Sequence, residues 1–350
     1  MRNRWAVCTG RSKHGINGLP AGQVDGGRSG SLGGRATADG YAGVKTILFL
    51  LAAIAGLTIN PDVAAAQCPS PEGVTLQILG SGGPIADDAR ASSAYLVWLD
   101  GKSRVLVDVG GGAFLRFGEA GARFEDLDHI AISHFHTDHA ADFVTLLKTG
   151  FFTDRTRPIG VSGPAGGGPF PSLTDYLAAN VGGDGAYQYL SGYMDGSGGL
   201  VRLEPVELDP SGDEVQAVRF MTDRDITITA TGVPHGIVPA IAYRVRVGET
   251  EIVFASDQNG NDDRFIEFAK DADVLVMHLV APEGIEGSFR ALHAPPSRIG
   301  EIASAANTGK LVLSHLTRWS LPDLDDNVAI VREHFDGEIV LAEDLACIDP

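Results

Sequence analysis

The segment 134–139, with the sequence His-Phe-His-Thr-Asp-His, places four side chains that can bind a metal within six positions. It follows a short apolar run that is typical of a buried strand, and a strand that ends in a turn can direct all four side chains to one place. His134 and His136 offer imidazole nitrogens to one metal, while Asp138 and His139 point the other way. A polar turn is the alternative interpretation, but three of the chain's ten histidines in six residues are hard to explain without a metal.

The pattern His-x-His-x-Asp-His resembles the signature of the metallo-β-lactamase-fold hydrolases. This resemblance extends over residues 74–342. Strands and helices are predicted to alternate around two halves of the chain, which suits the α/β, four-layered αβ/βα sandwich of that family. The resemblance implies two zinc ions per chain at the edge where strand ends meet. It also requires a third histidine, a bridging carboxylate and a final histidine farther along the chain.

Three later strands end in residues that meet this requirement. One leads to His235, the strand 251–257 ends in Asp257, and the strand 310–315 ends in His315. A lone histidine or aspartate at a strand end is usually a cap or a solvated group, so each match is weak by itself, but together they follow the family's order. The ligand set that the resemblance implies is His134, His136, His235 and Asp257 for one zinc, and Asp138, His139 and His315 for the other.

Three more residues receive roles from the resemblance. Asp108 ends the strand 105–109 ahead of three glycines, where the family has an aspartate that supports the metal ligands from behind; an ordinary strand-end aspartate is the alternative. Protonation of the leaving group is assigned to His293, with His278 as the weaker candidate, and a packed core histidine is the alternative for both. In ribonuclease Z a His-Glu pair stands where this chain has His278-Leu279, so the acid pair of that enzyme is in doubt.

The implied reaction is hydrolysis by a hydroxide that bridges two zinc ions, with Asp138 orienting the hydroxide as well as binding metal. Asp257 in place of a cysteine argues against the β-lactamases proper. The segments 234–244 and 313–319 resemble the branch with ribonuclease Z and related zinc phosphodiesterases and arylsulfatases. A phosphodiesterase or arylsulfatase acting on a small ester is the main expectation. The alternatives are a ribonuclease Z-like endoribonuclease, a lactonase-like or glyoxalase-like carbon-ester hydrolase, and a metal-binding protein without activity.

The charge of the chain bears on its partners. Residues 67–350 hold 20 basic and 42 acidic side chains, a net charge of −22, and no cluster of lysine and arginine is visible among them. An acidic surface repels polyanions unless a basic patch intervenes. We therefore expect a small-molecule ester substrate and no large nucleic acid as a partner.

The N-terminal part of the sequence is typical of export. Lys45 is followed by the apolar run 47–57, then by Pro61 and the tripeptide 64–66 of alanines. This order predicts a secretory signal peptide that is cleaved after Ala66, too short for a permanent membrane anchor. We expect residues 1–43 to be a disordered leader or to precede the true start of translation, 44–66 to be the signal peptide, and 67–350 to be a periplasmic or secreted hydrolase domain.

Two further expectations concern the exported domain. Cys68 and Cys347 lie at its two ends, where an oxidising compartment permits a disulfide; two unrelated surface thiols are the alternative. Residues 150–200 are rich in glycine and aromatic residues around one helical stretch, 172–179. Such a segment is either a mobile lid or a set of surface loops, and we favour a role in gating the substrate.

Overall fold

The computed structural model describes residues 68, 72–211 and 214–350. The predicted leader and signal peptide, 1–43 and 44–66, lie outside these residues. Among the helices that the structure describes, none is both long and apolar enough to cross a membrane.

The strands of the described residues form two seven-stranded sheets. In the first sheet the order is β14-β1-β2-β3-β4-β5-β6, and in the second it is β13-β12-β11-β10-β9-β8-β7. The first sheet consists of β1 (Val74–Gly80), β2 (Ala94–Leu99), β3 (Lys102–Val107), β4 (His129–Ala131), β5 (Ile159–Pro164), β6 (Leu203–Leu208) and β14 (Cys347–Ile348). The second consists of β7 (Gln216–Val218), β8 (Ile226–His235), β9 (Val238–Val247), β10 (Thr250–Phe254), β11 (Val274–His278), β12 (Lys310–Ser314) and β13 (Glu338–Leu341).

Each sheet contains a run of four parallel strands, and the inner strands of these runs are buried. β3, β4, β5 and β6 pair in parallel, as do β10, β11, β12 and β13. Every residue of β4, β5 and β11 is buried. Strands that are covered on both faces lose the alternation of polar and apolar residues, which is why these segments read as continuous apolar runs in the sequence.

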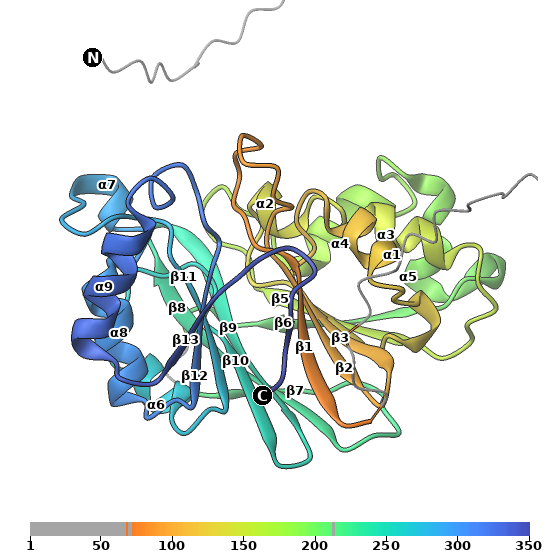
Figure 1. The fold of residues 1–350 in the computed structure, drawn as a ribbon. Helices are drawn as coiled ribbons and strands as arrows, with labels where there is room; N and C mark the ends of the chain where they lie inside the picture. The colour runs from red at the N-terminus through yellow and green to blue at the C-terminus, as the bar shows by residue number, and fades with distance from the viewer. Residues whose placement is uncertain (1–67, 69–71, 212–213) are drawn as a thin grey trace, which may run out of the picture. The chain divides into compact units, whose positions relative to one another are not determined.

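Helices cover the outer face of each sheet and complete four layers (Figure 1). One group lies on the first sheet, and its side chains join a core around Phe124, Leu146 and Tyr193. The other group lies on the second sheet around Phe265 and Ile299. A third core fills the space between the sheets. The helices are α1 (Ala113–Glu119), α2 (Thr137–Ala140), α3 (Phe143–Gly150), α4 (Leu173–Val181), α5 (Gly192–Asp195), α6 (Arg264–Ala269), α7 (Gly287–Arg290), α8 (Pro296–Ala305) and α9 (Leu324–His334). The predicted αβ/βα sandwich is therefore confirmed.

Residues 150–200 differ from the expectation of a mobile lid or surface loops. They contain β5, α4 and α5, and the side chains of Leu173, Leu177 and Tyr193 are fully buried in the core of the first sheet. The glycines are needed for turns and close contacts between these elements. A Cβ on Gly182, for example, would lie 2.4 Å from the carbonyl oxygen of Ala178. The glycines of this segment therefore form tight turns between short elements, and the apolar residues between the glycines belong to the core of the first sheet.

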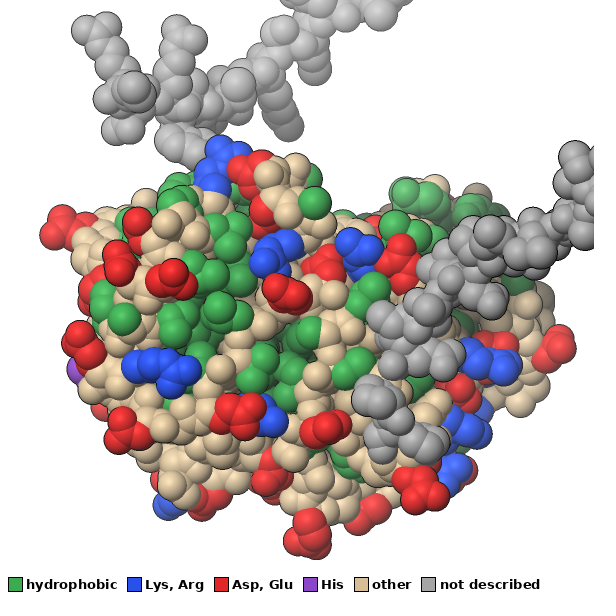
Figure 2. Space-filling model, in the orientation of Figure 1, with side chains coloured by type: hydrophobic (Ala, Val, Ile, Leu, Met, Phe, Trp, Pro, Cys, Tyr) green, Lys and Arg blue, Asp and Glu red, His purple; other side chains and the backbone are tan. Residues whose placement is uncertain are grey.

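The surface of the domain carries charges of both signs. On the face drawn in Figure 2, acidic side chains are spread over the whole surface and basic side chains are interspersed with them. This distribution agrees with the acidic composition of the chain.

The two ends of the domain are joined covalently. A disulfide links Cys68 to Cys347, with 5.5 Å between their Cα atoms, and confirms the predicted bridge. β14 pairs with β1 beside it. Next to β14, the carboxylate of Asp344 accepts hydrogen bonds from the backbone N–H groups of Ser81 and Ala91. The C-terminal segment is therefore fixed to the loop that follows β1.

Loss of the disulfide is expected to lower the free energy of unfolding by about 2–5 kcal/mol, because the bond closes a loop of almost the whole domain. Cys68→Ser and Cys347→Ser should show the same loss of unfolding free energy. The double variant should lose no more than either single variant, because all three lack the same disulfide. Denaturant unfolding measures the difference. Two free thiols in the non-reduced wild-type domain would contradict the bridge.

Candidate metal centre

Seven side chains predicted from the sequence meet at one end of the sandwich. They come from the segment after β4, from the end of β8 and from the segments that follow β10 and β12. Within each of two groups, one ligand atom per residue lies within 4.8 Å of the others: His134, His136, His235 and Asp257 form one group, and Asp138, His139 and His315 form the other. All of them except His136 are buried. The fold thus brings both sequence-predicted sets together, and it also brings His278 to within the same distance of Asp257 and His315.

The segment 134–139 owes its shape to its neighbours. β4 ends at Ala131, and α2 begins at Thr137, so Asp138 and His139 lie in the first turn of a short helix while His134 and His136 precede it. Gly110, which follows β3, lets the backbone there approach the segment 134–139 closely, because a Cβ at this position would lie 2.2 Å from the carbonyl oxygen of Asp138.

The backbone at three other strand ends is left-handed, which is unusual for residues with side chains. The angle φ is +57° at Asp108, +61° at Ser256 and +55° at His315. Such conformations cost free energy and cluster at functional sites, where the surrounding structure holds them. At these strand ends they accompany the turn of the chain toward the centre.

Hydrogen bonds fix which ring nitrogen of two histidines faces the centre. Nδ1 of His139 lies 2.7 Å from a carboxylate oxygen of Asp108, and Nδ1 of His235 lies 2.9 Å from the carbonyl oxygen of Leu292. Each Nδ1 therefore carries a proton, and Nε2 is the nitrogen of each ring that can bind a metal. Among the residues that the structure describes, neither buried Nε2 has a hydrogen-bond partner.

Those two nitrogens point at carboxylates. Nε2 of His139 lies 3.7 Å from Asp138, and Nε2 of His235 lies 3.6 Å from Asp257. Buried nitrogen lone pairs beside carboxylate oxygens are costly unless a cation lies between them. The donor set of five imidazoles and two carboxylates is suited to a divalent metal such as zinc.

Asp257 is held from behind by His278. Nδ1 of His278 lies 2.6 Å from Oδ1 of Asp257, and its Nε2 lies 3.0 Å from the hydroxyl of Tyr95, which also donates to Ser314. Oδ2 of Asp257 faces His235. Because both nitrogens of His278 have partners and its ring does not line the cavity described below, the geometry favours a positioning role over the predicted protonation of a leaving group.

The electrostatics of the centre follow from burial and from these pairs. Burial lowers the pKa of His139, but the carboxylates of Asp108 and Asp138 outweigh it and raise the pKa to about 9. Burial raises the pKa of Asp257, but His315 and His293 outweigh it and hold that pKa well below its ordinary value. A metal that binds here therefore finds an ionised carboxylate and must displace a proton from His139.

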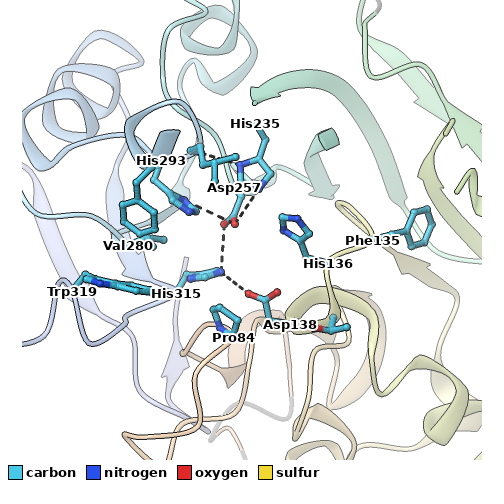
Figure 3. A pocket seen from close by; sticks show the side chains of 13 residues that line it. Pro84, Phe135, His136, Asp138, His235, Asp257, Val280, His293, His315 and Trp319 are labelled. Atoms are coloured by element: carbon cyan, nitrogen blue, oxygen red, sulfur yellow. Dashed lines mark hydrogen bonds and ion pairs between the residues drawn. The ribbon is translucent and has the colours of Figure 1, made fainter. Parts of the chain in front are cut away.

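A cavity of about 450 Å³ opens onto the centre. Figure 3 shows His293 beside Asp257, on the same side as Trp319 and opposite His136 and Phe135. Nδ1 of His293 lies 4.0 Å from Asp257 and is buried without a hydrogen-bond partner among the described residues. Burial lowers the pKa of His293 to about 3, although Asp257 opposes this, so the ring is neutral at pH 7 before substrate binds.

Asp108 is expected to act on metal affinity through His139 and Ser133. Its carboxylate accepts hydrogen bonds from both the backbone N–H and the hydroxyl of Ser133 and contacts Nδ1 of His139. Asp108→Asn should weaken metal binding by about 10-fold to 100-fold, the range for such supporting groups. Competition with a chelator measures the loss. Asp142→Asn, at a carboxylate that accepts hydrogen bonds from the backbone N–H groups of Gly112 and Phe114, is the control, and equal affinities for both variants would contradict the role of Asp108.

Sequence reasoning missed several residues that orient the centre, although it named six of the residues that line the cavity. The carbonyl of Leu292 and the hydroxyls of Ser133 and Tyr95 are in this group. Ser133 could have been found from the sequence, because it directly precedes His134. The others come from distant parts of the chain, and only the fold brings them to the centre. The cavity is lined by Pro84, Phe135, His136, Thr137, Asp138, His235, Asp257, Val280, Phe289, Leu292, His293, His315 and Trp319.

Comparison with known proteins places the chain in a family. Residues 103–316 match the family described as "Beta-lactamase superfamily domain". A ribonuclease Z of Mycobacterium sp. (strain KMS) is 28% identical over 286 residues, covering 78% of this chain and 94% of the relative. Another, from Methanosarcina acetivorans, is 26% identical over 299 residues and covers 77% of this chain and 96% of the relative.

Among solved structures, the short form of human tRNase Z matches with a TM-score of 0.60 and 19% identity, covering 79% of this chain and 98% of that one. At this identity the likeness shows the fold.

These relatives correct one prediction. The expectation of a small-molecule ester substrate without a large nucleic acid partner is wrong, because the relatives that match over most of the chain are ribonucleases. The physical reason is that net charge averages over the whole surface. A metal centre is a local positive charge that can hold a phosphate even on an acidic protein.

Divalent metal at this centre and hydrolytic chemistry follow from the family and from the two groups of ligands. The chain belongs to the beta-lactamase superfamily as a metallo-β-lactamase-fold hydrolase, in the branch of ribonuclease Z.

Proposed function

We propose that the protein is a zinc-dependent phosphodiesterase that hydrolyses RNA. The observation that carries the proposal is the pair of ligand groups at the floor of a cavity, in a chain whose sequence resembles ribonuclease Z over 78% of its length. Two zinc ions would be held, one by His134, His136, His235 and Asp257, and one by Asp138, His139 and His315.

Bound zinc would polarise the attacking water and neutralise charge on the phosphate. The chain's own residues have separate tasks. Asp138, whose pKa is held low because His139 and His315 outweigh its burial, orients the water. His278 and Tyr95 keep the carboxylate of Asp257 in place. The apolar side chains around the cavity exclude bulk water.

His293 is the candidate for protonating the leaving oxygen. Oxygen of the water forms a bond to phosphorus, and the bond from phosphorus to the leaving sugar oxygen breaks, with both electrons staying on that oxygen. The water gives up one proton and the leaving oxygen takes up one. His293 is neutral before the reaction. To act as the acid, it must first take up a proton during the reaction and then donate that proton to the leaving oxygen.

The test uses purified protein that is stripped of metal and reconstituted with zinc. A transfer-RNA precursor with a 3′ extension, an unstructured RNA, bis(p-nitrophenyl) phosphate, p-nitrophenyl sulfate and a lactone are offered separately. Cleavage of RNA and of the aryl phosphodiester, lost with a chelator and restored by zinc, supports the proposal. Turnover of the sulfate ester or the lactone alone contradicts it.

We also propose that the protein is exported by the signal peptide at 44–66. The disulfide between Cys68 and Cys347 supports an oxidising compartment. N-terminal sequencing of protein recovered from an expressing bacterium tests the cleavage site, and a mature chain that begins elsewhere than at Gln67 contradicts it.

A further inference from the structure

Two aromatic side chains continue the line of the active-site histidines toward solvent. The ring of Phe289 lies 5.0 Å from that of His293, and the ring of Trp319 lies 5.0 Å from that of Phe289. Trp319 is 42% exposed, and both aromatic residues line the cavity. We call Phe289 and Trp319 the aromatic row.

The aromatic row is held in place by its backbone. The hydroxyl of Thr317 donates to the carbonyl of Val280 and accepts from the N–H of Trp319. The carbonyl of Phe289 accepts from the N–H of His293. The rings are therefore presented on fixed segments, and a flat ligand that contacts them loses little to reorganisation of the protein.

The rest of the cavity leaves few other ways to hold a nucleotide. No lysine or arginine is among the described residues that line it. Metals at the floor would neutralise one phosphate, but the lining offers no lysine or arginine to a neighbouring phosphate. Its volume of about 450 Å³ lies within the range of about 300–1,000 Å³ of small-molecule sites. Binding strength beyond the metals must therefore come from apolar contact.

We propose that Trp319, packed against the tilted ring of Phe289, stacks on the nucleobase of the leaving nucleoside. His293 is the candidate for protonating the leaving oxygen, and Phe289 contacts His293 directly, so a base on Trp319 belongs to the nucleoside that departs. Every base has a flat π-face, so stacking of this kind binds RNA with little sequence preference. This inference rests on the proposed function.

The test compares RNA oligomers that contain a single scissile position. In one the nucleotide on the leaving side keeps its base, in a second that base is removed, and in a third the base on the other side is removed. Removal on the leaving side should lower kcat/KM of the wild-type protein by roughly 5-fold to 150-fold, the measured range for one stacked base. Removal on the other side should have a smaller effect.

Trp319→Ala and Trp319→Leu should show the same loss on the complete RNA, because leucine keeps apolar volume without a flat ring. Trp319→Phe should recover most of it. On the RNA that lacks the leaving-side base, Trp319→Ala and the wild-type protein should have nearly the same kcat/KM, because the stacking contact is absent in both cases. Phe152→Ala, at a more exposed aromatic residue outside the cavity, is the control that should behave like wild type.

The results separate the two proposals. Equal losses for Trp319→Ala on all three RNAs, or no effect of removing the leaving-side base, overturn the stacking contact while RNA hydrolysis stands. A protein that turns over no phosphodiester with zinc overturns the proposed function itself. Thermal unfolding of each Trp319 variant, and the same comparison with Phe289→Leu, guard against a loss that comes from misfolding.

Discussion

Replacing His134 with alanine is expected to remove bound metal and activity together. The ring is fully buried, and its Nε2 lies 3.0 Å from Nδ1 of His136 and 4.0 Å from Asp257, so alanine leaves this group of ligands one nitrogen short. Metal ions supply several kcal/mol of transition-state stabilisation, which corresponds to a fall in kcat/KM of about 10³-fold or more. Metal content by mass spectrometry and phosphodiesterase rates are measured on the same sample.

Asp257→Ala should give the same joint loss, since that carboxylate faces both groups of ligands: its two oxygens lie 3.6 Å from His235 and 3.5 Å from His315. His334→Ala, at an exposed residue on α9, is the matched control and should keep both metal and activity. Wild-type protein that holds no metal after reconstitution with zinc would show that the central assignment is wrong.

The second large effect separates protonation from metal binding. His293→Ala should leave the zinc content unchanged while the rate on an alkyl or ribose ester falls by roughly 10²-fold to 10⁴-fold, the span of acid catalysis. An ester whose leaving group is already a stable anion, such as nitrophenolate, should lose little because it needs no proton. Rates on the two ester types, with metal content, are the measurement.

His278→Gln serves as the comparison for that experiment. His278 acts on Asp257 from outside the cavity, so its loss should slow both esters by the same factor. If His293→Ala also slows both equally, it positions the substrate instead of protonating it. If zinc is lost with His293, the residue binds metal.

The metal ligands could be predicted because their information is local. His134, His136, Asp138 and His139 are adjacent in sequence, and the other three ligands stand at or next to the ends of apolar runs whose ends a sheet brings together. The Cys68–Cys347 bridge followed from the positions of the two cysteines at the ends of the domain and from the predicted export.

Other features depend on tertiary contacts and were not predictable in this way. The partners of His278 and His235 are Tyr95 and Leu292, which lie 183 and 57 residues away. The short strand β5 was missed because glycine and proline interrupt it, although all of its residues are buried in the fold. The net charge of the chain led to a wrong prediction about nucleic acid partners, because it sums charges over the whole protein, whereas a phosphate is recognised by the groups close to it.

The Cys68–Cys347 bond makes the domain a covalent ring, since 279 positions separate the two cysteines. A protease that cuts the exposed turn around Gly284 would leave six of the seven metal-binding residues on one fragment and His315 on the other. The fragments would stay tethered through the sulfur bridge and through β11 and β12, which pair across the cut. A nicked molecule would therefore migrate at full mass without reductant and as two fragments with it.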